Sequence, residues 1–130
     1  MKIQKATDEP DRIFVLEEQY GSDIQQNIIS KAKFLIGARY HSIIFSINQA
    51  IPFISLCYEH KMKGVTDMLN KEDIDLHDLF DGNKLTDNRC DAFITRIISM
   101  SKEIKPDTEA QETARSIANK GFIKLTEYLN

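Results

Sequence analysis

The stretch FLIGARYHSIIFSINQAIPFISLCY, residues 34–58, decides the fold of this chain of 130 residues. It opens on an apolar run of strand length at residues 34–36, which Gly37 ends. Residues 39–50 are apolar almost all round, which is the pattern of a helix buried against a sheet. A second apolar run follows at residues 53–58. Strand, helix and strand in this order predict two parallel strands joined by a crossover helix.

Similar elements extend this unit in both directions. Towards the N-terminus we expect a strand at residues 13–16 and a helix over residues 22–32, with Ser22 as its N-cap. Towards the C-terminus we expect a helix that ends near Asn70, and then either a short strand or an extended turn at residues 74–76. This alternation is typical of a parallel sheet covered by helices.

Two longer helices complete the predicted order. The first begins at Thr86 or Asp87, and its apolar face follows helical spacing: Cys90, Phe93, Ile94, Ile97 and Ile98. The second begins near Asp107, and Gly121 interrupts its apolar stripe: Ala114, Ile117, Ala118, Phe122 and Leu125. The chain is therefore predicted to be a single α/β domain over residues 1–130. We expect a small Rossmann-like, three-layer arrangement with a parallel sheet of three to four strands.

Composition narrows the class of protein. Apolar residues make up 42% of the chain and charged residues 28%, a balance typical of a globular domain and not of a disordered one. The formal charge of −3 and the lack of an aromatic-rich basic patch argue against nucleic-acid binding. The apolar stretches fall short of the roughly 20 residues that a membrane-spanning helix needs, and no apolar segment follows the first basic residues as in a signal peptide.

The two cysteines, Cys57 and Cys90, are too few for a disulfide framework. Both lie in apolar surroundings along the sequence, so we expect buried thiols in a reducing compartment. This predicts a cytoplasmic protein.

Two strand–helix junctions carry the side chains that could do chemistry. The first is residues 37–41, GARYH, and the second is residues 58–64, YEHKMKG. Because adjacent parallel strands end at the same edge of a sheet, Arg39, His41 and Lys61 could converge there on one anion. Arginine and lysine bind carboxylate or phosphate, and histidine can transfer a proton near neutral pH. Each residue also has a structural alternative: a hydrogen-bonding histidine, a surface ion pair or a solvated lysine.

These junctions resemble the signature of the polysaccharide pyruvyltransferase family. That signature has the form G-x-R-x-H, then an apolar helix, a proline-led strand and Y-x-x-K-x-x-G. Residues 37–69 read GARYHSIIFSINQAIPFISLCYEHKMKGVTDML and match its positions in order: Gly37, Arg39, His41, Tyr58, Lys61 and Gly64. The resemblance spans residue 13 to about residue 70, and the part from Lys71 onwards carries no motif of the family.

The resemblance implies a fold and a reaction. Family members resemble two-domain transferases of the GT-B type and transfer the enolpyruvyl part of phosphoenolpyruvate to two hydroxyls of a sugar, as a ketal. It implies that His41 is the general acid, that Arg39 holds the donor's carboxylate or phosphate, and that Lys61 holds its phosphate. Gly37 belongs to the same donor-binding set, and Tyr58 and Gly64 are expected to shape the second loop.

The resemblance also implies partners. They are phosphoenolpyruvate, a saccharide acceptor, and an N-terminal half or partner chain that supplies the rest of the active site. Known members are considerably longer, so we expect this chain to be a C-terminal, donor-binding half that is inactive alone. Neither a cofactor nor a metal is expected. Self-association and peripheral contact with a membrane-linked glycan of exopolysaccharide biosynthesis stay open.

Two other functions remain as alternatives. One is the nucleotide-sugar-binding half of a GT-B glycosyltransferase, which would have a similar fold. The other is a truncated, non-catalytic interaction domain. Of the remaining histidines, His60 is expected on a loop surface, and His77 with Asp75 and Asp78 does not complete a familiar set of metal ligands.

Overall fold

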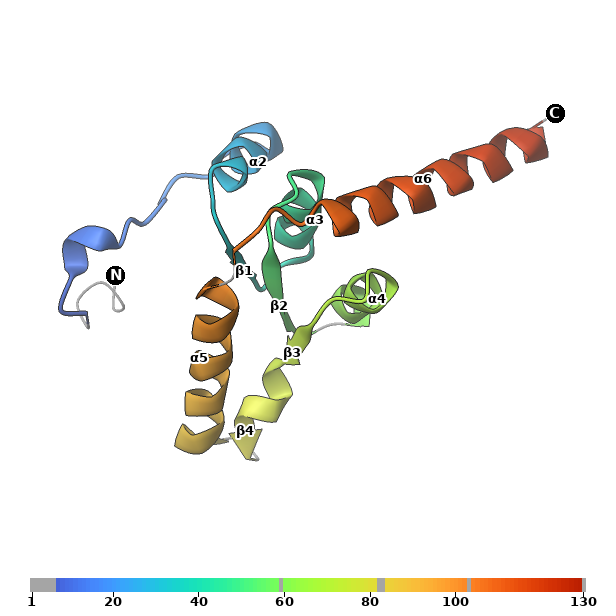
Figure 1. Cartoon of the computed structure of the whole chain (residues 1–130). Coiled ribbons are helices and arrows are strands. Elements are labelled where there is room, and N and C mark those ends of the chain that lie inside the picture. Colours follow the sequence, from blue (N-terminus) through green and yellow to red (C-terminus); the bar gives the residue numbers. More distant parts are fainter. Residues whose placement is uncertain (1–6, 59, 82–83, 103, 130) are drawn as a thin grey trace.

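A three-stranded parallel sheet forms the centre of the structure (Figure 1), a computed structural model that describes residues 7–58, 60–81, 84–102 and 104–129. Its strands are β1 (Leu35–Gly37), β2 (Phe53–Cys57) and β3 (Asp73–Asp75), in the order β1-β2-β3. The crossover helices are α3 (Tyr40–Asn48) and α4 (His60–Met68). Both pairs of strands are parallel. The structure thus confirms the predicted α/β class with a small Rossmann-like sheet, and residues 74–76 prove to belong mainly to a strand.

The other elements surround this sheet. In chain order they are η1 (Pro10–Arg12), α2 (Ser22–Ser30), η2 (Leu76–Leu79), β4 (Phe80–Asp81), β5 (Lys84–Leu85), α5 (Asp87–Lys102) and α6 (Thr108–Leu129). The antiparallel pair of β4 and β5 was not predicted. None of the helices in the described parts of the chain is long and apolar enough to cross a membrane.

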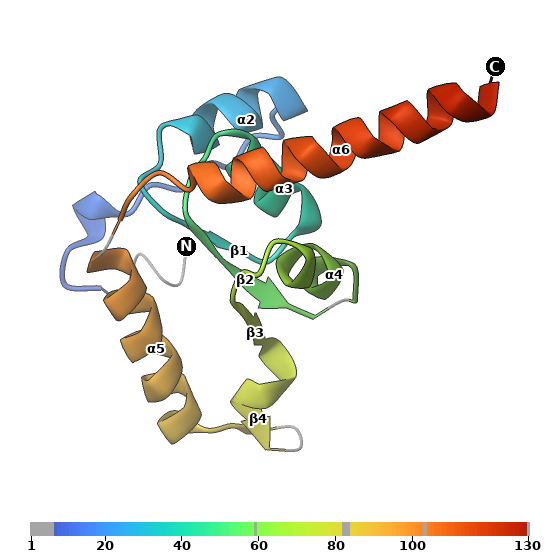
Figure 2. The same ribbon diagram turned by 45° about the vertical axis from the view of Figure 1, so that its right-hand side comes forward.

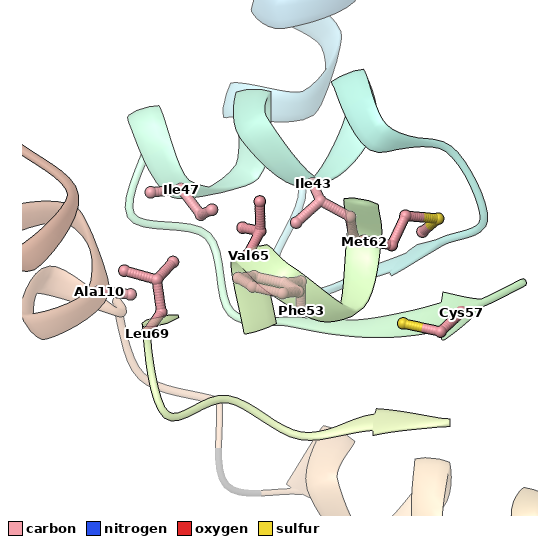
Figure 3. Close-up of a cluster of buried hydrophobic side chains, with 8 residues drawn as sticks. All are labelled: Ile43, Ile47, Phe53, Cys57, Met62, Val65, Leu69 and Ala110. Atoms are coloured by element: carbon pink, nitrogen blue, oxygen red, sulfur yellow. The ribbon is translucent and has the colours of Figure 1, made fainter. Parts of the chain in front are cut away.

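The core lies between the sheet and the two crossover helices (Figure 3). The buried apolar side chains come from α3, β2, α4, the residue after α4, and α6: Ile43, Ile47, Phe53, Cys57, Met62, Val65, Leu69 and Ala110. Buried hydroxyls within this layer have local partners, since Ser46 Oγ donates to the Ile51 carbonyl at 2.6 Å and Thr66 Oγ1 to the Lys63 carbonyl at 2.9 Å. Because apolar burial is the main stabilising term, this layer fixes where α3 and α4 begin.

The first turn of α6 joins the core to the C-terminal part of the chain. Asp107 Oδ1 accepts a hydrogen bond from the Ala110 amide at 3.3 Å and lies 2.8 Å from Lys71 Nζ. Gln111 Nε2 donates to the carbonyl of Asn48 at the end of α3. Asp107 therefore caps α6, which begins at Thr108, next to the predicted start near Asp107.

Beyond this first turn, α6 extends away from the rest of the molecule (Figures 1 and 2). The helix is continuous through Gly121, in spite of the interruption that the sequence suggested. Most of its apolar stripe is not buried, since Phe122 is 68% and Leu125 55% exposed.

Helix α5 lies on the opposite side of the sheet from α4 (Figures 1 and 2). Arg96 on α5 forms an ion pair with Glu72, the residue before β3, with a Nη2–Oε1 distance of 2.5 Å. The predicted apolar face of α5 is only partly covered, because Phe93 and Ile97 are half-buried and Ile94 and Ile98 are exposed.

The prediction of a strand at residues 13–16 is wrong. The chain there follows η1 without joining a sheet, and Phe14 is 86% exposed. An apolar run becomes a strand only where a neighbouring strand and a covering layer are in place, and residues 13–16 belong to neither sheet of the described structure. A smaller correction concerns α2, whose N-cap is Gly21 and not Ser22.

The prediction of buried thiols is confirmed for Cys57 and only partly for Cys90. Both Cys57 and Cys90 are free thiols. Cys57 is buried, with 4% of its surface exposed, whereas Cys90 is only half-buried on α5. The partial cover of α5 explains the difference.

Candidate functional site

The first junction lies where β1 ends and α3 begins. Arg39 is the N-cap residue of α3, in an extended backbone conformation (φ −130°, ψ 140°). Its carbonyl accepts hydrogen bonds from the Ser42 hydroxyl at 2.6 Å and the Ser42 amide at 3.1 Å. The turn is therefore closed by backbone and serine groups, which leaves the Arg39 side chain out of it. Backbone N–H groups at such a helix start favour an anion.

Gly37 permits the close approach of α3 to the end of β1. A Cβ atom on this buried residue would lie 2.5 Å from Ile43 Cδ1 and 2.9 Å from Ser42 Oγ. Because Ile43 is itself only 1% exposed, its side chain cannot move aside freely. The glycine of the first motif thus sets the distance between strand and helix.

Arg39 lines a pocket of about 730 Å³ between the N-terminal segment and α2, which we call the Arg39 pocket. Within the described part of the chain Arg39 forms no ion pair, so its charge is not neutralised by a close carboxylate. Gln25 Nε2 donates to the Tyr20 carbonyl at 2.6 Å and holds the N-terminal segment against α2. Sequence reasoning missed this wall, which is formed by Leu16, Glu18, Gln19, Tyr20, Gln25, Ile28 and Ile29.

His41 lies in the first turn of α3 and is exposed. Its imidazole meets the Tyr40 ring edge to face, with centroids 5.7 Å apart, and lies 6.3 Å from the Phe45 ring. Within the described residues, these two ring contacts come from α3 itself. His41 is thus an accessible imidazole at the start of α3, where it could transfer a proton.

The second junction differs from the predicted loop. Helix α4 already begins at His60, so Lys61 and Gly64 lie on the helix and only Tyr58 precedes it. Lys61 is exposed, and a Cβ added at Gly64 would meet no atom within 4 Å. The glycine of the second motif therefore has no packing role in this chain.

A second pocket, of about 390 Å³, lies at the carboxyl ends of β2 and β3, and we call it the Lys63 pocket. Figure 2 shows α4 beside these strand ends. The walls of the Lys63 pocket include His60, which is exposed as predicted but lies at the start of a helix and not on a loop. The lining residues are Cys57, Tyr58, His60, Lys63, Asp73, Asp75 and Asp78. Sequence reasoning missed Lys63 and Asp73 because the strand register, with Asp73 opposite Ser55, brings them together.

Charges in the Lys63 pocket are partly paired. Lys63 Nζ lies 3.7 Å from Asp67 Oδ1 and 3.6 Å from Asp73 Oδ2, and these two carboxylates, Asp67 first, raise the pKa of Lys63. Burial raises the pKa of the Cys57 thiol, and the Asp73 carboxylate acts in the same direction. Cys57 therefore stays protonated at neutral pH and is not a nucleophile there.

The structure places both junctions at one edge of the sheet but does not join them. Arg39 and Tyr58 line different pockets. In residues 7–58, 60–81, 84–102 and 104–129, no hydrogen bond or ion pair connects Arg39 or His41 with Lys61. No three His, Cys, Asp or Glu side chains in the same ranges could hold a metal ion. The side chain of His77 lies outside the described ones.

Comparison with known proteins agrees with the sequence motifs. Residues 2–60 match the model of the family described as polysaccharide pyruvyl transferase. The match confirms the resemblance: residues 2–60, somewhat under half of the chain, are similar to this family. It includes Gly37, Arg39, His41 and Tyr58 and ends before Lys61. No solved structure matches the chain.

The two motif glycines should respond differently to alanine. Gly37→Ala should lower the free energy of unfolding by about 1–3 kcal/mol, because its Cβ meets the buried Ile43. Gly64→Ala is the matched control and should raise it by up to about 1 kcal/mol, because alanine favours a helix and has space there. Urea unfolding followed by circular dichroism measures both, and equal effects would contradict the packing role of Gly37.

The two thiols should differ in reactivity. In the native chain at pH 8, iodoacetamide should modify Cys57 roughly tenfold more slowly than Cys90, and both equally fast in urea. Because the native pKa of Cys57 is raised above its ordinary value of 9.0, the rate at which iodoacetamide modifies Cys57 should keep rising above pH 9. Peptide mass spectrometry of both cysteines gives the rates. Native labelling of Cys57 as fast as in urea would show that its thiol is not buried.

Proposed function

We propose, on the ground that residues 2–60 match the polysaccharide pyruvyl transferase family, that this chain binds phosphoenolpyruvate and supplies the donor half of a pyruvyl transferase. The observation that carries the proposal is the pairing of Arg39 and His41 around the start of α3. In the described structure Arg39 is a cation without an ion pair, and His41 is an exposed imidazole that contacts the rings of Tyr40 and Phe45. The donor needs these two functions, because it is an anion and must receive a proton.

Arg39 binds the donor through its planar guanidinium. A guanidinium matches a carboxylate with two parallel hydrogen bonds. The backbone N–H groups at the start of α3 add to the attraction for an anion at this edge. Lys61, exposed on the first turn of α4, serves the phosphate as a mobile positive charge.

His41 delivers the proton. Its imidazolium protonates the methylene carbon of phosphoenolpyruvate, so that the adjacent carbon becomes an oxocarbenium-like centre. One sugar hydroxyl adds to that centre and loses its proton, which restores the imidazolium. The second hydroxyl displaces phosphate, which leaves with the remaining proton, and the ketal is complete. Atoms and charge balance without a cofactor, and the exposure of His41 leaves its imidazole accessible to the donor.

Catalytic turnover needs groups beyond those at the start of α3, because the acceptor must be bound as well as the donor. The acceptor's two hydroxyls must reach the carbon next to the one that His41 protonates, and the described part of the Arg39 pocket contains no second domain to hold that acceptor. We therefore propose that a second half, in the same polypeptide or in a partner chain, closes the site as in the GT-B arrangement. Such an enzyme would act on a cytoplasmic or membrane-linked intermediate of exopolysaccharide synthesis.

Binding of the donor can be tested by amide NMR. Titration of the labelled chain with phosphoenolpyruvate should give saturating shifts at residues 37–41, and inorganic phosphate should give weaker ones. The double variant Arg39→Ala, His41→Ala should lose these shifts, and affinity should fall about tenfold or more because a charged hydrogen-bonding group is removed.

Arg115→Ala, on the exposed part of α6, is the matched control and should bind as the natural chain does. The proposal fails if a well-folded chain shows no shifts at residues 37–41, or if the double variant keeps them.

A further inference from the structure

The tip of α6, residues 115–128, lies outside the packed part of the molecule. The first turn of the helix is held by the Asp107 cap and by the hydrogen bond from Gln111 Nε2 to the Asn48 carbonyl. Every residue of the tip is exposed, and Figures 1 and 2 show that this part of the helix projects away from the sheet. The tip is therefore a formed helix on a fixed base, with its surface open to a partner.

One side of the tip is apolar. Ile117, Phe122 and Leu125 continue the stripe in which Ala114 packs against the core, and Tyr128 extends it to the last turn. Phe122 is 68% and Tyr128 94% exposed. A groove of about 490 Å³ on the tip is lined by residues of α6 alone: Ile117, Lys120, Gly121, Ile123, Lys124 and Glu127. Within the described part of the chain, the apolar side of the tip is thus uncovered.

The charges of α6 are arranged around this apolar side. By helical spacing, Arg115 and Lys124 border it on its two sides, roughly 80–100° from its middle, and Lys120 lies one turn before Lys124. The carboxylates lie farther round the helix, roughly 140–160° from that middle: Glu109, Glu112 and Glu127. The tip carries three cations and one carboxylate, whereas the whole chain has a formal charge of −3. An anionic surface therefore attracts the tip and repels the rest of the molecule.

A second copy of the chain is a poor partner for the tip. Two tips, each about 21 Å long, would together bury less than about 1,000 Å² when packed side by side, below the roughly 1,200 Å² or more that is typical of stable interfaces. The apolar side is bordered by cations in both copies, so pairing would also bring like charges together.

We propose that the tip of α6 binds the surface of an anionic phospholipid membrane, with its apolar side at the level of the headgroups and its cations at the lipid phosphates. A helix with one apolar side and basic residues beside it lies in the plane of such a surface. The stems of Lys120 and Lys124 follow the apolar side while their ammonium groups reach the phosphates. This membrane contact does not depend on the proposed donor site.

Co-sedimentation of the whole chain with sucrose-loaded vesicles tests the membrane contact. The vesicles consist of phosphatidylcholine alone or of phosphatidylcholine with about one third phosphatidylglycerol. The anionic vesicles should bind the chain at least about tenfold more tightly than the neutral ones, because each basic residue near an anionic surface adds to the affinity. Sodium chloride at about 0.5 M should remove most of this difference, because salt screens exposed charges.

Variants at exposed positions of α6 connect binding to the apolar side. Leu125 and Ile123 are similarly exposed, at 55% and 58%, but lie on opposite sides of the helix. Leu125→Ser should weaken binding to the anionic vesicles about tenfold, and its matched control Ile123→Ser less than about twofold. Replacement of both Lys120 and Lys124 by alanine should weaken binding by more than about tenfold. Circular dichroism verifies that each variant keeps its helices.

Three results would overturn the membrane contact: no binding of the well-folded chain to anionic vesicles, equal binding to neutral ones, or equal effects of Leu125→Ser and Ile123→Ser. Sedimentation velocity without lipid tests the second copy as the competing partner. A monomer that binds the anionic vesicles supports the membrane contact. A dimer that Leu125→Ser dissociates would assign the apolar side to a second copy and would refute the proposal.

Discussion

The contact between Gly37 and Ile43 is the constraint on which the rest of the site depends. Ile43 is among the most buried residues of the core, and it reaches the end of β1 only because residue 37 has no Cβ. This contact brings the first turn of α3 against the carboxyl edge of the sheet. Arg39 is the N-cap of that turn and His41 lies within it, so the core packing of α3 sets where their backbones lie. The placement of Arg39 and His41 at this edge therefore depends on the packing of the core beneath it.

The edge divides into two regions of opposite charge. Around Arg39 the structure offers a guanidinium and a helix start, both of which attract anions. Around Lys63 it offers carboxylates that outnumber the single ammonium. An anionic donor would therefore favour the region around Arg39 over the region around Lys63.

Sequence reasoning located β1, α3 and β2, because continuous apolar runs around Gly37 and an all-round apolar helix have few other interpretations. It placed Arg39 and His41 at the sheet edge for the same reason. It failed at residues 13–16, where an apolar run of the same kind stays outside the sheet and leaves Phe14 exposed. It also missed the pair of Lys63 and Asp73, since only the register of β2 and β3 brings these residues together. Local patterns identify elements, whereas pairing and cover are decided by distant parts of the chain.

The most direct test of the central claim is the choice of anion. Calorimetric titration of the chain with phosphoenolpyruvate, in the presence and absence of saturating uridine diphosphate, measures that choice. The account predicts that phosphoenolpyruvate binds more tightly than the nucleotide and that its isotherm does not change when the nucleotide is present. Tighter binding of uridine diphosphate, with displacement of phosphoenolpyruvate, would contradict the account and would assign the edge around Arg39 to a nucleotide sugar.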